Sequence, residues 1–164
     1  QLALGDSISI ATLNKKKFNK YDFSRLHPGG NLGTQLKTVG DLMLIKNKIP
    51  FINENSNMKA AINIITEKKL GMLIARNKNG DTTGIITDGN VRRIRQWKKN
   101  IEDLTVKKIM TKKPVSVDLN MMAAKALRIM NEKKITSLCV HKKTKKNKTI
   151  GIIHIHNILE ANIE

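Results

Sequence analysis

The residue best suited to proton transfer is His27, which opens the segment His27-Pro28-Gly29-Gly30. An imidazole titrates near neutral pH, so it can both take and give a proton during a reaction. Pro28 restricts the preceding backbone to extended conformations, and the two glycines allow a sharp turn behind it. The pattern fits a reactive histidine, and it fits equally a loop histidine that only caps or packs.

Two further groups invite a chemical interpretation. His154 and His156 are two residues apart at the end of an apolar run and can face one side, but no third His or Cys ligand lies nearby in the sequence, so we predict no metal site. Cys139 lies inside the apolar run "SLCV". We expect a buried core residue there rather than a nucleophile, and a single cysteine cannot form an internal disulfide.

The length and composition indicate an ordinary folded chain. Its 164 residues suit one domain or two very small ones, and 40% of them are hydrophobic. No apolar run approaches the roughly 20 residues of a membrane-spanning helix, and no signal peptide opens the chain. We therefore expect a cytoplasmic protein with no membrane partner, and we interpret the chain as a fragment of a longer one.

The formal net charge of +18 suggests nucleic acid or an anionic surface as a partner. The lysines, however, occur as short pairs along the whole chain instead of forming one stripe. Aromatic residues make up only 3% of the sequence, too few for a surface on which bases stack. We predict solvated surface lysines and no nucleic-acid binding.

The elements that must position these residues come from an internal repeat at an offset of 65 to 67 residues. "VGDLM" from Val39 matches "VKKIM" from Val106, and "GIITDGN" from Gly84 matches "GIIHIHN" from Gly151. Between these lie "MKAAINIITEKKLGMLI" and "MAAKALRIMNEKKITSLCV". Each unit of about 60 residues buries little surface alone, so we expect the two to pair.

Each copy has the periodicity of strand, helix, strand, strand, helix. In the first copy we predict a helix from Met58, a hairpin through 71–76 and 82–87, and a helix capped by Asp88 that runs toward Trp97. In the second copy we predict a helix over 120–133, strands over 137–141 and 150–154, and a helix over 157–161. The expected fold class is therefore α/β, of the α+β kind.

This tandem arrangement resembles the CBS domain pair over roughly Val39 to Ile163. In that family the cleft between the modules commonly binds adenosine nucleotides, with a Thr near phosphate and an acidic residue three positions on at the ribose. The matching positions here are Thr87 with Asn90 and His154 with Asn157.

Because an amide bonds the ribose more weakly than a carboxylate, the resemblance implies a nucleotide or nucleotide-sugar other than ATP or AMP, or an empty cleft. Arg93, with its neighbour Arg92, either reaches an anionic ligand across that cleft or is simple surface charge.

The residues before the repeat, "GDSISIATL" and "FNKYDFSRLHPGGNLGTQL", resemble the end of the sugar-phosphate isomerase (SIS) domain of bacterial D-arabinose-5-phosphate isomerases. In that family the SIS domain precedes a CBS pair. The resemblance implies three parts: residues 1–36, the helical tail of a truncated, Rossmann-like SIS domain; residues 37–100, the first CBS module; and residues 101–164, the second.

That resemblance also implies a function. The family interconverts ribulose 5-phosphate and arabinose 5-phosphate for synthesis of Kdo and lipopolysaccharide, which makes His27 a catalytic residue of the intact enzyme acting on a sugar phosphate. The chain by itself is expected to be inactive, to need no cofactor, to form homo-oligomers and to sense an effector such as CMP-Kdo. The alternative is a stand-alone basic CBS ligand-binding module.

Overall fold

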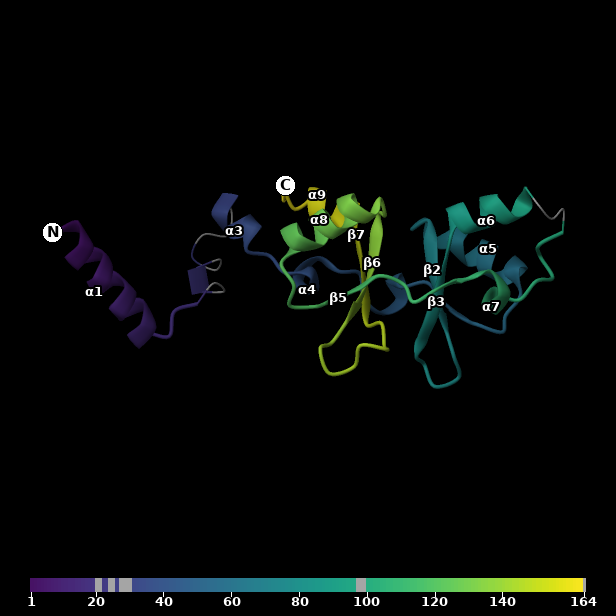
Figure 1. Ribbon diagram of the computed structural model, residues 1–164, viewed down its shortest axis with the longest axis horizontal. Helices are drawn as coiled ribbons and strands as arrows, with labels where there is room; N and C mark the ends of the chain where they lie inside the picture. The colour runs from purple at the N-terminus through teal and green to yellow at the C-terminus, as the bar shows by residue number, and fades with distance from the viewer. Residues whose placement is uncertain (20–21, 24–25, 27–30, 97–99, 164) are drawn as a thin grey trace.

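The computed structural model describes residues 1–19, 22–23, 26, 31–96 and 100–163 of the chain. Two small sheets stand side by side, each with its own helices, and helix α1 (Leu2–Lys15) stands apart from both (Figure 1). Across the described ranges, no helix combines the length and apolarity that crossing a bilayer demands.

The first sheet has the strand order β1-β2-β3-β4. Its strands are β1 (Phe51–Asn53), β2 (Met72–Arg76), β3 (Thr82–Thr87) and β4 (Thr111–Lys112). β1 runs parallel to β2, and the other two pairs are antiparallel. Helix α5 (Met58–Lys68) buries Met58, Ala61 and Ile65 against this sheet, while α6 (Asp88–Arg95) follows β3 directly.

The second sheet has the order β5-β6-β7, with β5 parallel to β6 and β6 antiparallel to β7. Its elements are β5 (Ser116–Asp118), α8 (Ala123–Lys133), β6 (Ser137–His141), β7 (Gly151–His154) and α9 (Ile155–Leu159). α8 buries residues at helical spacing, among them Ala123, Leu127 and Met130, over that sheet. The repeat seen in the sequence is thus a repeat of structure.

The short opening helices of the two repeats are exchanged between the modules. Helix α4 (Val39–Leu42) opens the first repeat, yet Val39 is fully buried in the core of the second sheet, and Leu44 exchanges backbone hydrogen bonds of 2.7 and 3.1 Å with Ile152. Helix α7 (Val106–Ile109) opens the second repeat, and Val106 is buried in the first core. The boundary predicted between residues 100 and 101 therefore describes the sequence repeat, while each core draws residues from both repeats.

Two equivalent glycines make this exchange possible. A side chain at Gly84 would approach Met110 Sδ to 2.7 Å, and one at Gly151 would collide with the sulfur of Met43. Each glycine lies on the last strand of one module, and each methionine follows the opening helix of the other repeat. Glycine is required because the incoming methionine occupies the volume of a Cβ.

The modules meet through an apolar layer and through their hairpin tips. The layer contains Ile49, Met72 and Ile74 of the first repeat and Cys139 and Ile152 of the second. The β2–β3 and β6–β7 loops extend to the same end of the molecule (Figure 1). There the Asn147 amide donates to Asp81 Oδ1 at 2.8 Å and the Thr82 backbone N–H donates to the Asn147 carbonyl at 2.8 Å, so the two modules form one body.

The predicted elements are confirmed, with three differences at helix ends. The N-cap before α6 is Thr87, not Asp88, because the Thr87 hydroxyl accepts from the Asn90 N–H. α8 begins at Ala123, three residues later than predicted, and α9 spans Ile155–Leu159 rather than 157–161. α6 ends at Arg95, and Trp97 lies outside the described residues.

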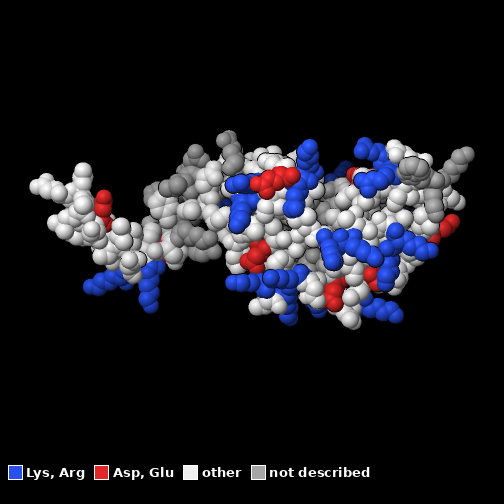
Figure 2. All heavy atoms as spheres, in the orientation of Figure 1, with Lys and Arg blue, Asp and Glu red and all other residues white. Residues whose placement is uncertain are grey.

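The remaining short elements are α3 (Asn31–Gln35) and the 3-10 helix η1 (Lys46–Lys48). On the face shown in Figure 2, Lys and Arg side chains are scattered over both modules, with acidic side chains among them. The residues of the long β6–β7 loop, 142–148, are all exposed, and five of them are lysines.

Candidate ligand-binding pocket between the modules

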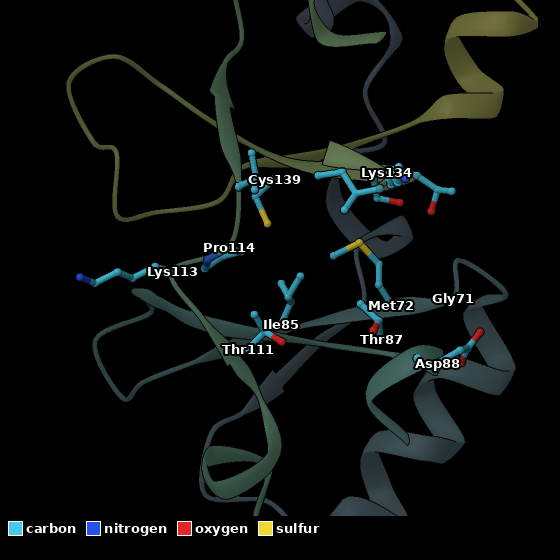
Figure 3. Close-up of a pocket in the computed structure, with 15 residues that line it drawn as sticks. Gly71, Met72, Ile85, Thr87, Asp88, Thr111, Lys113, Pro114, Lys134 and Cys139 are labelled. Carbon is cyan, nitrogen blue, oxygen red and sulfur yellow. The ribbon is translucent and has the colours of Figure 1, made fainter. Parts of the chain in front are cut away.

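A cavity of about 470 Å³ opens between the two modules. The first module contributes the β2 start, β3 and the first turn of α6. The second contributes the turn after α8 and the first half of β6, and the segment from β4 to β5 forms a further wall (Figure 3). The lining residues are Gly71, Met72, Ile85, Thr87–Gly89, Thr111, Lys113–Val115, Lys134–Ser137 and Cys139. We call this cavity the inter-module pocket.

The turn before β2 lets helix α6 start at the pocket's edge. Gly71 has φ +64, and its carbonyl accepts from the Asp88 N–H at 3.0 Å. A Cβ at Gly71 would lie 3.2 Å from Asp88 Oδ2. Only glycine combines the left-handed backbone with this close approach. The contact between Gly71 and Asp88 therefore fixes the position of the β3 end and the α6 start at the pocket.

Thr87 and Asn90 form a reciprocal capping box at the start of α6. The Asn90 side-chain oxygen accepts from the Thr87 N–H at 2.9 Å and from the Thr87 hydroxyl at 2.8 Å. The Asn90 amide donates to the Thr111 hydroxyl at 3.2 Å, which ties α6 to β4. Asn90 is buried and does not line the pocket, so its polar atoms are occupied within the protein.

On the opposite wall, Ser137 carries a buried hydroxyl that lacks a hydrogen-bond partner. In the described residues, the buried side-chain N or O atoms without a hydrogen bond are Arg76 Nε, Asp118 Oδ2 and Ser137 Oγ. Of these three residues, Ser137 lines the pocket. A buried hydroxyl without a partner, on a residue that lines a cavity, is a candidate to bond a molecule inside it.

The pocket is apolar between the sheets and charged at its rim. Met72, Ile85 and Cys139 face one another across its interior (Figure 3). Burial raises the pKa of the Cys139 thiol to about 11, so at neutral pH this thiol is protonated and does not act as a nucleophile. Lys113, Lys134 and Asp88 supply the charge. The arrangement suits a molecule with an apolar body, a hydrogen-bonding group and an anionic end.

The corresponding end of β7 is built differently. The His154 ring Nδ1 accepts from the His156 backbone N–H at 3.2 Å, and the two imidazole rings stand edge to face with centroids 4.7 Å apart. Burial, and secondly the neighbouring His156, lower the pKa of His154. Asn157 accepts from the His154 N–H at 3.2 Å. Within the described ranges, no cluster of three or more His, Cys, Asp or Glu residues is placed to hold a metal.

The structure brings together only part of the predicted site. Thr87 lines the inter-module pocket, but Asn90, His154 and Asn157 do not, and Arg93 is exposed on α6 away from its lining. Their role in binding stays a prediction. His27 lies outside the described residues.

Sequence reasoning missed the pocket residues of the second repeat. Lys134 and Thr136 lie between α8 and β6, Ser137 begins β6, and all three belong to the wall that the second module forms. The available signal was the polar pair Thr136-Ser137 interrupting an otherwise apolar run in "KKITSLCV". Polar side chains entering a buried strand mark either a turn or a contact surface, and here they mark the pocket.

The architecture defines a class of protein: two α+β modules related by an internal repeat and packed through their sheets, with a ligand-sized pocket at their junction. The CBS domain family matches residues 39–96 and 106–164. The chain therefore belongs to the CBS domain family and contains a tandem pair of CBS domains.

Solved CBS structures share this fold. The crystal structure of CBSX2 in complex with AMP has a TM-score of 0.65 and 23% identity, and the match covers 76% of this chain and 95% of that one. The CBS domain of the bacterial CNNM/CorC family Mg²⁺ transporter in complex with ATP has a TM-score of 0.66 and 16% identity, covering 79% of this chain and 89% of that one.

One curated relative extends the similarity beyond the modules. Arabinose 5-phosphate isomerase KdsD from Salmonella typhimurium (strain LT2) is 32% identical over 163 residues, which is 99% of this chain and 49% of that protein. The chain thus spans about half the length of this relative, and the matched half includes residues on both sides of Val39.

Proposed function

We propose that this chain is the regulatory, ligand-sensing part of an arabinose-5-phosphate isomerase and that its inter-module pocket binds a nucleotide or nucleotide-sugar. The observation that carries the proposal is the pocket itself: its volume of about 470 Å³ lies in the range of small-molecule sites, and its wall holds the unpartnered Ser137 hydroxyl. The AMP and ATP complexes of structurally similar CBS pairs support the ligand class.

The effector we favour is CMP-Kdo, a product further along the pathway that the isomerase would supply. Its carboxylate and phosphate suit the lysines at the rim, Lys113 and Lys134. Asn90 is a weak candidate for holding an adenosine ribose, because an amide lacks the charge of a carboxylate and this one is engaged by Thr87 and Thr111. A ligand anchored elsewhere in the pocket does not depend on it.

Helix α1 supports the assignment of residues 1–36 to an SIS domain. It has no buried residue, and its apolar side chains lie all around it instead of on one face. The exposed ones are Leu2, Leu4, Ile8, Ile10 and Leu13, with 44 to 87% of their surface accessible. A helix that is apolar on every side belongs inside a larger core, which the remaining half of the parent enzyme would provide.

Within that parent enzyme we assign His27 to proton transfer on a sugar phosphate, and we place the protein in the cytoplasm as a homo-oligomer. The chain alone has no complete isomerase site in this proposal, so it shows no turnover of ribulose 5-phosphate. Turnover by the purified chain above that of a His27→Ala variant would contradict the division of labour.

Calorimetric titration with ATP, AMP, CMP and CMP-Kdo tests the ligand. We expect CMP-Kdo to bind most tightly, and tightest binding by ATP would overturn that preference. Ser137→Ala removes the hydroxyl and is expected to weaken binding about 5- to 10-fold, the effect of one hydrogen bond. Ser116→Ala, which changes an exposed serine on β5 outside the pocket, is the matched control and leaves affinity unchanged.

A further inference from the structure

The internal repeat gives the strand end at the inter-module pocket an equivalent in the second module. β3 ends at Thr87 opposite Met72, and β7 ends at His154 opposite Ser137, in the same antiparallel register. Each strand then enters a helix through a capping box with Asn three residues on. The end of β7 is therefore the place where the repeat would form a second pocket, and we call it the counterpart position.

Each of the three residues at the counterpart position is larger than its equivalent at the pocket. Thr87 is replaced by His154, and Gly89, which lines the pocket without a side chain, is replaced by His156. Asp88 is replaced by Ile155. The two imidazoles pack against each other with centroids 4.7 Å apart; His154 is half-buried and His156 is exposed, so imidazole rings stand at the two positions where the pocket has the small residues Thr87 and Gly89.

The wall segment also differs between the two places. In the pocket, the chain runs from β4 through Lys113 and Pro114 into β5. At the counterpart position the chain after Leu44 makes the extra 3-10 turn η1. The cavity beside that turn, of about 290 Å³, is lined by residues of the first repeat and includes neither His154 nor any other residue of β7 in its lining, which consists of Leu44, Asn47, Lys48, Glu67, Lys68 and Leu70.

We propose that the pair binds one nucleotide-class ligand per chain, in the inter-module pocket, and that His154 and His156 close the counterpart position. The proposal rests on the function proposed above and goes further, because it makes two related modules unequal. With one site on each chain, occupancy depends on the concentration of one effector, and there is no cooperativity between two sites on the same chain.

Two double variants that exchange the side chains of the pocket and the counterpart position test the proposal. The double variant His154→Thr/His156→Gly gives the counterpart position the side chains of the pocket, and Thr87→His/Gly89→His gives the pocket the imidazole pair. Calorimetric titration of the 164-residue chain with AMP and with CMP-Kdo measures the stoichiometry, and far-UV circular dichroism confirms that each variant is folded.

We expect one site in the unchanged chain, two in the first variant, and at least a tenfold loss of affinity in the second. Two sites in the unchanged chain, or one site in a folded first variant together with full affinity in the second, would overturn the inference while leaving ligand sensing intact. Absence of binding by the unchanged chain to every nucleotide tested would instead overturn the proposed function, and this inference with it.

Discussion

Replacing Asn90 by alanine separates a structural role from a ligand-binding one. In the structure the Asn90 side chain makes three hydrogen bonds, two accepted from Thr87 and one donated to Thr111. The residue is only 8% exposed, so water does not readily replace them. We therefore expect Asn90→Ala to destabilise the fold rather than to act on binding alone.

The magnitude follows from these bonds and from a natural control. At about 0.5 to 1 kcal/mol for each internal hydrogen bond, the three bonds correspond to an expected loss of about 2 kcal/mol. Asn157, the equivalent residue, is half-buried and accepts one bond of 3.2 Å from the His154 N–H. Asn157→Ala is expected to cost about 0.5 to 1 kcal/mol.

Urea denaturation of both variants, followed by circular dichroism, measures the difference directly. In thermal denaturation of a chain of this size, the loss of about 2 kcal/mol expected for Asn90→Ala corresponds to a fall in Tm of about 4 to 8 °C. Equal losses for the two variants would refute the reasoning. So would an Asn90→Ala chain of unchanged stability that had lost nucleotide affinity, since that result would place the side chain on the ligand.

Three further predictions concern packing, pH and thiol chemistry. Gly84→Ala places a methyl group against Met110 and should cost about 1 to 3 kcal/mol in urea denaturation, whereas Gly5→Ala, with open space around it, should cost nothing. The hydrogen bond from Lys107 lowers the pKa of Glu54 below its ordinary 4.5. The stability that this carboxylate contributes is therefore present above pH 4.5 and is lost as the pH falls through the lower pKa of the folded state. Free energies of unfolding measured against pH should decline less in acid for Glu54→Gln than for the unchanged chain, and identical curves would count against the contact. Cys139, with its raised pKa of about 11, should react with a chromogenic disulfide reagent only after unfolding, and rapid reaction of the native chain would contradict its burial.

The sequence was sufficient for the elements and for their repetition, because both depend on local patterns. Met58, Ala61 and Ile65 recur at helical spacing, and the apolar runs flanking "NKNGD" can only pair as a hairpin. The burial of Cys139 also followed from its apolar neighbours. The predicted helix starts were less accurate than the predicted strands. Thr87 and Asp88 are both good N-cap residues, and only the hydrogen bond that the Asn90 N–H donates to the Thr87 hydroxyl distinguishes them.

The candidate site was predicted less well, because a motif gives a residue's place on its own strand and not its neighbours. "GIITDGN" placed Thr87 correctly at the strand end, but it could not reveal that Asn90 turns inward to Thr87 and Thr111. Ser137 carries no motif. Its importance appears only when the first module packs opposite it and leaves its hydroxyl without a partner.

The sequence by itself determined that the chain contains two similar α+β units, since hydrophobic period and turn residues act over a few neighbours. Only the tertiary structure decided that each unit is completed by the opening of the other repeat, with Val39 in one core and Val106 in the other. It also decided that the end of β3 lines a pocket, while at the end of β7 two imidazole rings pack against each other. Such choices depend on contacts between residues far apart in the sequence, such as Gly84 with Met110 and Gly151 with Met43, and no local pattern encodes them.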